Sequence, residues 1–248
     1  MNRIIIPLAI LATACSNEDR YDEVELYGPV DLQVDASQKH READAFCDRD
    51  RDHAELRIVD RVLFVDVSDD SHCTVVVHDR ISAVYSNGNR GRVQVSLSGN
   101  VDLDTLSGDR VDIDASGDGH ARIRDIHADS VRLDTTGDTL IELDHLTTGD
   151  LDTSVGGSAE LVIGDLVATR WDAYGRGNSV VEASGMVDRL MLDMRGSAVL
   201  DASEVMAGHV GGEAGGNAMV TATALDEVTI ETTGNAQVDA VLSPVWAE

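Results

Sequence analysis

Three residues whose side chains commonly bind metals recur at intervals of twenty: Asp125, His145 and Asp165. Two carboxylates and an imidazole can ligate a transition metal if the fold brings them together. Equal spacing would do this if twenty residues were one structural repeat, because equivalent residues of successive repeats then stack. The simpler interpretation is three polar side chains in exposed turns, and the metal site is the alternative.

A second set of candidate residues is mainly acidic and recurs with similar spacing: Ser96, Asp114, Asp134, Ser154, Tyr174, Asp193, Glu213 and Glu231. Stacked carboxylates repel one another, so cations, protons or nearby arginines must neutralise them. Arg132, Arg176 and Arg195 are expected on the same outward face. A solvated acidic face is the main expectation. Weak binding of Ca²⁺ is the alternative, and no other cofactor is expected.

The acidic residues also raise the question of a glycan-cleaving enzyme. A glycoside hydrolase needs two carboxylates at a defined separation. A polysaccharide lyase needs a basic proton acceptor beside aspartates that hold calcium. The sequence shows no distinctive cluster of either kind, and its spacing leaves no long insertions to form the walls of a substrate groove. We therefore expect a protein without catalytic residues, with a β-helical lyase or hydrolase as the alternative.

The spacing comes from a repeat with glycines at Gly99, Gly117, Gly137, Gly157, Gly177, Gly196, Gly216 and Gly234, separated by 18 to 20 residues. Apolar residues lie six and four positions before most of these glycines and four and six after those from Gly117 on, with mainly polar residues between them, a pattern typical of strands with one buried face. The period near 20 predicts a solenoid. We expect an all-β, single-stranded parallel β-helix of about eight coils of 18–20 residues over residues 92–242. The glycines are expected at structural turns, with a second turn about eight residues after each.

The N-terminal segment predicts export and lipid anchoring. Residues 1–14 combine a basic start, an apolar run from Ile4 to Leu11 and small residues before Cys15, as in a lipoprotein signal peptide. Cys15 is the expected lipidation site, and an ordinary cleaved signal peptide is the alternative. The acyl chain would tether the protein to a membrane, and Ser16 favours the outer membrane, with either the periplasmic or the outer surface possible.

The segments around the repeats are expected to be a tether and two caps. Residues 15–55 are acidic and without periodicity, which predicts a tether; residues 56–91 predict N-terminal cap strands, and residues 243–248 a C-terminal cap or tail with Trp246 over the last coil. Two cysteines in an exported chain favour a disulfide between Cys47 and Cys73. A metal site involving His72 and His78 is the rival interpretation.

The composition limits the partners. The 248 residues carry a formal net charge of −27, whereas nucleic-acid-binding proteins show basic patches, so nucleic acid is not an expected partner. The charge suits an extracellular or envelope surface. A surface glycan or an envelope protein is the expected partner, and the oligomeric state is left open.

A repeated sequence motif is clearest in residues 95–100, 113–119 and 133–138. In each, alternating apolar residues are followed by a small polar residue, then Gly and then Asn or Asp. It resembles the head GIN domain family of putative auto-transporter adhesins over roughly residues 57–240. The resemblance implies an exported protein, often a lipoprotein, with a right-handed β-helix of this coil size, and no catalytic residues. The expected function is an adhesin-like binding or structural module, with a polymerising envelope scaffold as a further alternative.

Overall fold

A computed structural model describes residues 23–27, 30–35, 43–47, 54–59, 62–67, 73–77, 83–87, 92–97 and 100–243 of the chain. These residues form sixteen strands and no helix. The eight short N-terminal strands are β1 (Glu23–Tyr27), β2 (Val30–Asp35), β3 (Ala43–Cys47), β4 (Ala54–Val59), β5 (Val62–Val67), β6 (Cys73–Val77), β7 (Ala83–Asn87) and β8 (Arg92–Leu97). They are followed by β9 (Asn100–Gly117), β10 (His120–Gly137), β11 (Leu140–Val155), β12 (Glu160–Gly177), β13 (Val180–Gly196), β14 (Val199–Gly216), β15 (Met219–Gly234) and β16 (Gln237–Leu242).

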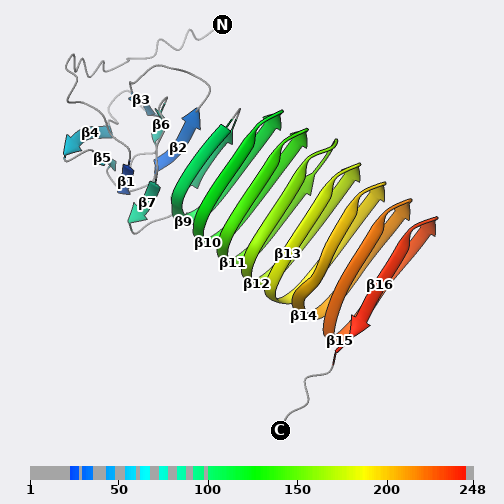
Figure 1. The fold of residues 1–248 in the computed structure, drawn as a ribbon. Coiled ribbons are helices and arrows are strands. Elements are labelled where there is room, and N and C mark those ends of the chain that lie inside the picture. Colours follow the sequence, from blue (N-terminus) through cyan, green and yellow to red (C-terminus); the bar gives the residue numbers. More distant parts are fainter. Residues whose placement is uncertain are drawn as a thin grey trace, which may run out of the picture.

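The strands from β9 to β15 confirm the predicted solenoid, because each makes one coil and pairs in parallel with its neighbours in sequence order. Figure 1 shows these coils stacked side by side from β9 to β16. Residues twenty apart are register partners in the central coils, as in the pairs Ile123–Leu143 and Leu143–Ile163. Apolar side chains therefore stack into continuous columns inside the solenoid.

Each coil has three sides, which the burial of β10 makes plain. Its buried apolar residues are Ala121 and Ile123 on one side, Ile126 on the second, and Val131 and Leu133 on the third. We call these the first side, the short side and the long side, and use the same names for every coil. The strand continues around the corners between them, so the expected second turn is instead two corners within one strand.

The glycine turns of the described coils agree with the sequence prediction. The seven repeat glycines from Gly117 to Gly234 have φ between 74° and 101°, a region that side chains disfavour; Gly99 lies outside the described residues. A Cβ on Gly177 would stand 2.7 Å from the carbonyl oxygen of Gly157 in the preceding coil. That oxygen accepts a hydrogen bond from the backbone N–H of Asn178 at 2.7 Å. The glycines therefore allow successive turns to stack closely.

One coil contains an aromatic side chain in the core. Trp171 is fully buried at a long-side position where its neighbours are Leu151 and Leu190, and its indole N–H donates to the hydroxyl of Thr153 at 2.9 Å. Thr153 and Ala173 take the positions at which the flanking coils have Leu133 and Leu192. These two exceptions to the repeat therefore make room for the indole and satisfy its donor.

The N-terminal strands stack in an order different from their order in the chain. Strand β1 lies between β5 and β7, and β2 lies between β6 and β8, in parallel in every case. The outermost strands, β4 on β5 and β3 on β6, are antiparallel. These antiparallel strands end the parallel stack and serve as its N-terminal cap.

These findings correct the expected boundaries before the repeats. The segment 15–55, expected as a tether, contains β1, β2, β3 and the start of β4. Strands β5 to β8, most of which lie in the segment expected to form the cap, instead continue the parallel stack. The tether prediction is therefore wrong for these strands, and the cap begins earlier than expected.

The C-terminal end is only partly covered by described residues. Strand β16 pairs with residues 219–224 of β15, and the backbone N–H of Ser243 donates to the carbonyl of Ala224 at 2.9 Å. The rest of β15 has no further described strand beside it, and Val228 and Ile230 are only half-buried. The predicted cap residue Trp246 lies outside the described residues.

Candidate functional site

The structure stacks the three predicted metal-ligating residues but does not bring them together as a site. Asp125 is the register partner of His145, and His145 is that of Asp165. His145 Nδ1 lies 3.6 Å from Asp165 Oδ2, with both side chains about 60 % exposed. Within the part of the chain that the structure describes, no group of three His, Cys, Asp or Glu residues could hold a metal ion. The arrangement supports the simpler interpretation of three polar side chains, which lie at corners of successive coils.

The acidic column forms along the long side in the expected register, and arginines neutralise part of it. Arg132 Nε lies 2.7 Å from the carboxylate of Asp134. Arg195 bridges two coils, with Nε 2.6 Å from Asp193 and a terminal nitrogen 3.1 Å from Glu213. Hydrogen bonds to these carboxylates raise the pKa of both arginines. Most of these groups are exposed, so the pairs mainly offset the repulsion between stacked acids.

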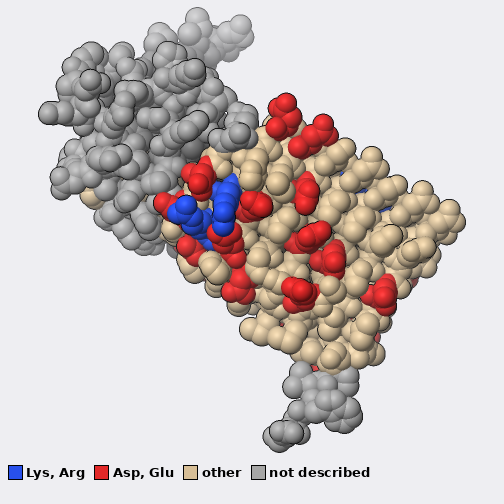
Figure 2. Space-filling view, viewed as in Figure 1, with Lys and Arg blue, Asp and Glu red and all other residues tan. Residues whose placement is uncertain are grey.

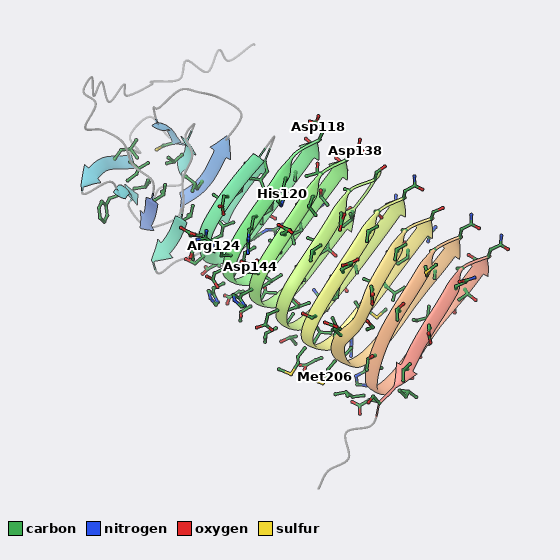
Figure 3. The ribbon with its side chains drawn as sticks, in the orientation of Figure 1. Asp118, His120, Arg124, Asp138, Asp144 and Met206 are labelled. Carbon is green, nitrogen blue, oxygen red and sulfur yellow. The ribbon has the colours of Figure 1, made fainter. Side chains whose placement is uncertain are left out.

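The first side of the N-terminal coils carries a further set of charge pairs between coils. His120 Nε2 lies 2.8 Å from Glu142, and Arg122 lies 2.9 Å from Asp144. Arg124 pairs with Asp104 of the preceding coil. Figure 2 shows basic side chains gathered at this end among acidic ones, and Figure 3 labels His120, Arg124 and Asp144 there. The visible face carries fewer charges toward the C-terminal coils.

A depression lies on the long side of β13, β14 and β15. Its volume is about 430 Å³, and it is lined by Arg189, Met191, His209, Val210, Gly211, Gly212, Glu213, Glu227, Thr229 and Glu231. A second depression of about 260 Å³ adjoins it and shares Met191, Gly212 and Glu213. Together they form one shallow groove that crosses several coils, which we call the long-side groove.

Two adjacent glycines create the deeper part of this groove. Gly211 is the register partner of Met191 and Thr229, so a side chain is missing from the middle of this outward column. Gly212 takes an inward position between Leu192 and Ile230, with φ of 130°. A Cβ on Gly212 would collide with the carbonyl oxygen of Leu192, so this position needs glycine. At Gly211 the nearest atom to an added Cβ is the flexible Met191 sulfur, at 3.2 Å.

The groove combines apolar surface with charges of both signs. Arg189, His209 and Glu227 stack along one edge, and Glu213 and Glu231 stack along the other. Met191 is 41 % exposed between them. This arrangement offers hydrogen-bond acceptors and a cation around an apolar floor, which suits the binding of a polar ligand with an apolar face.

Tyr174 extends the groove toward β12. Its side chain is 41 % exposed and lines the adjoining depression with Asp193 and Arg195. Partial burial, followed by the nearby carboxylates of Asp172 and Asp152, raises the pKa of Tyr174. The phenol therefore stays protonated at neutral pH and can donate a hydrogen bond while its ring presents an apolar face.

Sequence reasoning did not identify this groove. The acidic column includes Tyr174, Asp193, Glu213 and Glu231, which line its edge. The useful signal was Gly212, which interrupts an inward column that has Leu192 and Ile230 in the neighbouring coils.

The described residues include the predicted disulfide cysteines but not the predicted lipid anchor. Cys47 is disulfide-bonded, and Cys73 is its direct partner in the antiparallel ladder of β3 and β6. The position of Cys73 supports the predicted pairing, which would fix the cap strand β3 to the stack. Cys15 and the expected signal peptide lie outside the described residues. Among the residues that are described, no helix is long and apolar enough to cross a membrane.

Comparisons with known proteins give similarity to one family. Three crystal structures are similar over 90 % of this chain. A putative adhesin from Parabacteroides merdae ATCC 43184 has 18 % sequence identity, 92 % of its chain covered and a TM-score of 0.49. A putative lipid binding protein from Parabacteroides distasonis ATCC 8503 has 13 % identity, 93 % of its chain covered and a TM-score of 0.39, and a putative adhesin from Bacteroides fragilis NCTC 9343 has 11 % identity, 93 % of its chain covered and a TM-score of 0.30. No curated protein matches the chain. The model of the family described as "Putative auto-transporter adhesin, head GIN domain" matches residues 20–173 and again 128–244, so the chain belongs to this family.

Proposed function

We propose that this protein is a non-catalytic, adhesin-like binding module of the cell envelope, which holds a surface glycan in the long-side groove. Family membership supports a role in adhesion. The observation that carries the choice of site is the missing side chain at Gly211, which opens a depression of about 430 Å³ between Met191 and Thr229.

The chemistry of the groove favours a glycan as the ligand. Sugars present hydroxyl groups at their edges and apolar C–H groups on their faces. Glu213, Glu227 and Glu231 can accept hydrogen bonds from hydroxyls, and Arg189 can donate them. The Met191 side chain and the Tyr174 ring supply apolar surface for a sugar face. An extended groove of this kind suits several sugar units of a chain.

The experiment measures glycan-array binding by the full chain, purified in detergent, and by two variants. Gly211→Gln adds a side chain to the groove at a position without positive φ, so the fold should persist while glycan binding falls by about tenfold or more. Thr147→Gln makes a similar addition at an exposed site on the short side and should bind as the unaltered protein does. Equal glycan binding by all three proteins, or no glycan binding by the unaltered protein, would refute the proposal.

The proposal includes a lipid on Cys15 as the anchor to the envelope. Cells expressing the protein and labelled with an alkyne fatty acid should yield a labelled, membrane-associated product. Cys15→Ser should remove the label and release the protein from the membrane fraction. A labelled Cys15→Ser variant would show that the lipid is elsewhere.

The scaffold alternative has less support. Head-to-tail polymerisation would require the parallel edge at the N-terminal end to be open to another molecule. Strands β3 and β4 instead lie antiparallel on β6 and β5 at that end. This cap blocks continuation of the parallel stack there.

A further inference from the structure

The short side carries an exposed apolar column on its C-terminal coils. Val167, Met186 and Met206 are successive register partners and are 42 %, 52 % and 47 % exposed. The column continues through Thr223 to Val241, which is 53 % exposed. We call these five residues the methionine stripe. In Figure 3 the labelled Met206 points away from the coils.

The same column is polar in the N-terminal coils. Ser107, His127 and Thr147 take the positions equivalent to Val167 and Met186. The architecture therefore accepts polar side chains here, and the fold does not explain the change to Val and Met. Exposed apolar side chains that gather in one line are typical of an interaction surface.

Acidic residues flank the stripe on both edges. Asp165 and Glu204 come two residues before Val167 and Met206, and Asp188 comes two residues after Met186; all three are exposed. The nearest arginines belong to the long side: Arg170 pairs with Asp150 at 3.2 Å and with Asp172 at 3.4 Å, and Arg189 lines the groove. The sequence contains no Lys or Arg after Arg195. A partner of this stripe should therefore be basic at its edges and apolar at its centre.

The spacing of the stripe matches an α-helix that lies along the solenoid. Coils repeat about every 4.8 Å, whereas residues three or four apart in a helix are separated by about 4.5–6 Å along its axis. Such a helix can therefore place one apolar side chain on each coil. The five coils of the stripe span about 19 Å, the length of a helix of about 13 residues. Methionine suits such a contact because its flexible, unbranched side chain adapts to different apolar surfaces.

We propose that the methionine stripe is a docking site for a basic amphipathic helix of a partner protein. The apolar face of the helix packs on Met186 and Met206, and its Lys or Arg side chains reach Asp165, Asp188 and Glu204. The site lies on a different side of the coil from the long-side groove, so the protein can hold a glycan and a protein partner at once.

The test uses fluorescence anisotropy of a labelled 14-residue Leu/Lys amphipathic helix with the full chain in detergent. The double variant Met186→Gln/Met206→Gln should bind this peptide about tenfold or more weakly. The matched control is Met219→Gln, because Met219 is 48 % exposed but lies on the first side of its coil. This variant should bind the peptide as tightly as the unaltered protein does. This comparison separates docking on the stripe from general attraction of a basic peptide to an acidic protein.

The acidic residues beside the stripe are tested with the double variant Asp188→Asn/Glu204→Gln. It should bind the Leu/Lys peptide more weakly, and the affinity should depend less on salt concentration. Asp201→Asn should change neither the affinity nor its salt dependence. A Leu/Glu peptide of the same pattern should not bind. Equal affinity of the methionine double variant and the unaltered protein would overturn the proposal. So would binding of the Leu/Glu peptide, or methionine-dependent binding of phosphatidylcholine vesicles without peptide binding, which would identify a membrane surface as the occupant.

Discussion

The hydrogen bond between Trp171 and Thr153 provides a sharp test of how the core accepts a large aromatic residue. Both residues are fully buried, and the indole N–H has its partner at 2.9 Å. Thr153→Val keeps the side-chain volume but leaves this N–H without an acceptor in an apolar interior. An unsatisfied buried donor costs about 1–3 kcal/mol, so the free energy of unfolding should fall by this amount.

The assay is a double-mutant cycle measured by urea unfolding and followed by far-ultraviolet circular dichroism. In a Trp171→Phe background the donor is absent, so Thr153→Val should be nearly neutral, and the coupling should be about 1–2 kcal/mol. Ser179→Ala is the control, because its buried hydroxyl has no hydrogen-bond partner among the described residues and its removal should not destabilise. A coupling below about 0.5 kcal/mol would refute the reasoning.

Three further predictions concern the turns, the charges and the cap. Gly177→Ala should lower the free energy of unfolding by about 1–3 kcal/mol because of its positive φ and the close backbone, whereas Gly156→Ala, which has neither, should change it by less than about 0.5 kcal/mol. Burial, together with the carboxylates of Asp134 and Asp172, raises the pKa of Asp152, although Arg132 lowers it. The charged form of Asp152 therefore destabilises the fold once the pH exceeds the pKa of this group in the unfolded chain, about 3.9. Asp152→Asn should raise the melting temperature at pH 7 but not near pH 3, where Asp152 is protonated in both the folded and the unfolded protein. Non-reducing peptide mapping should recover Cys47 linked to Cys73, and recovery of Cys47 with another partner would contradict that pairing.

The coils could be predicted because the signals that define them are local. The alternation of apolar residues gives the inward positions, and each repeat glycine fixes a turn that another side chain would strain. The order of the N-terminal strands could not be predicted in this way. Strand β1 pairs with β5 and β7, whose residues are about 40 and 60 positions later, and five residues carry no signal that selects such distant partners.

The candidate metal residues show the limit of spacing as a guide to function. The period placed Asp125, His145 and Asp165 in one column, but register alone does not make side chains converge. Outward side chains on successive coils point into solvent in parallel, and a metal requires ligands that point to one centre. A sequence repeat therefore predicts which side chains stack on successive coils much better than it predicts which of them form a binding site.

The two proposed binding surfaces both arise where outward columns change their chemistry, while the inward columns stay apolar except at Gly212 and Gly185. Val210 and Val228 maintain the core beside the long-side groove, although the outward residue between Met191 and Thr229 has become Gly211. The change from Thr147 to Val167 and Met186 leaves Leu166, Ala168 and Val187 buried beside them, although Gly185 takes the inward position next to Met186. Packing constrains only the inward half of each coil, because those residues alone contact the coils above and below in the core. The outward residues can therefore change without loss of the core and form binding surfaces. The function of this solenoid should be sought where the outward residues depart from the repeat pattern.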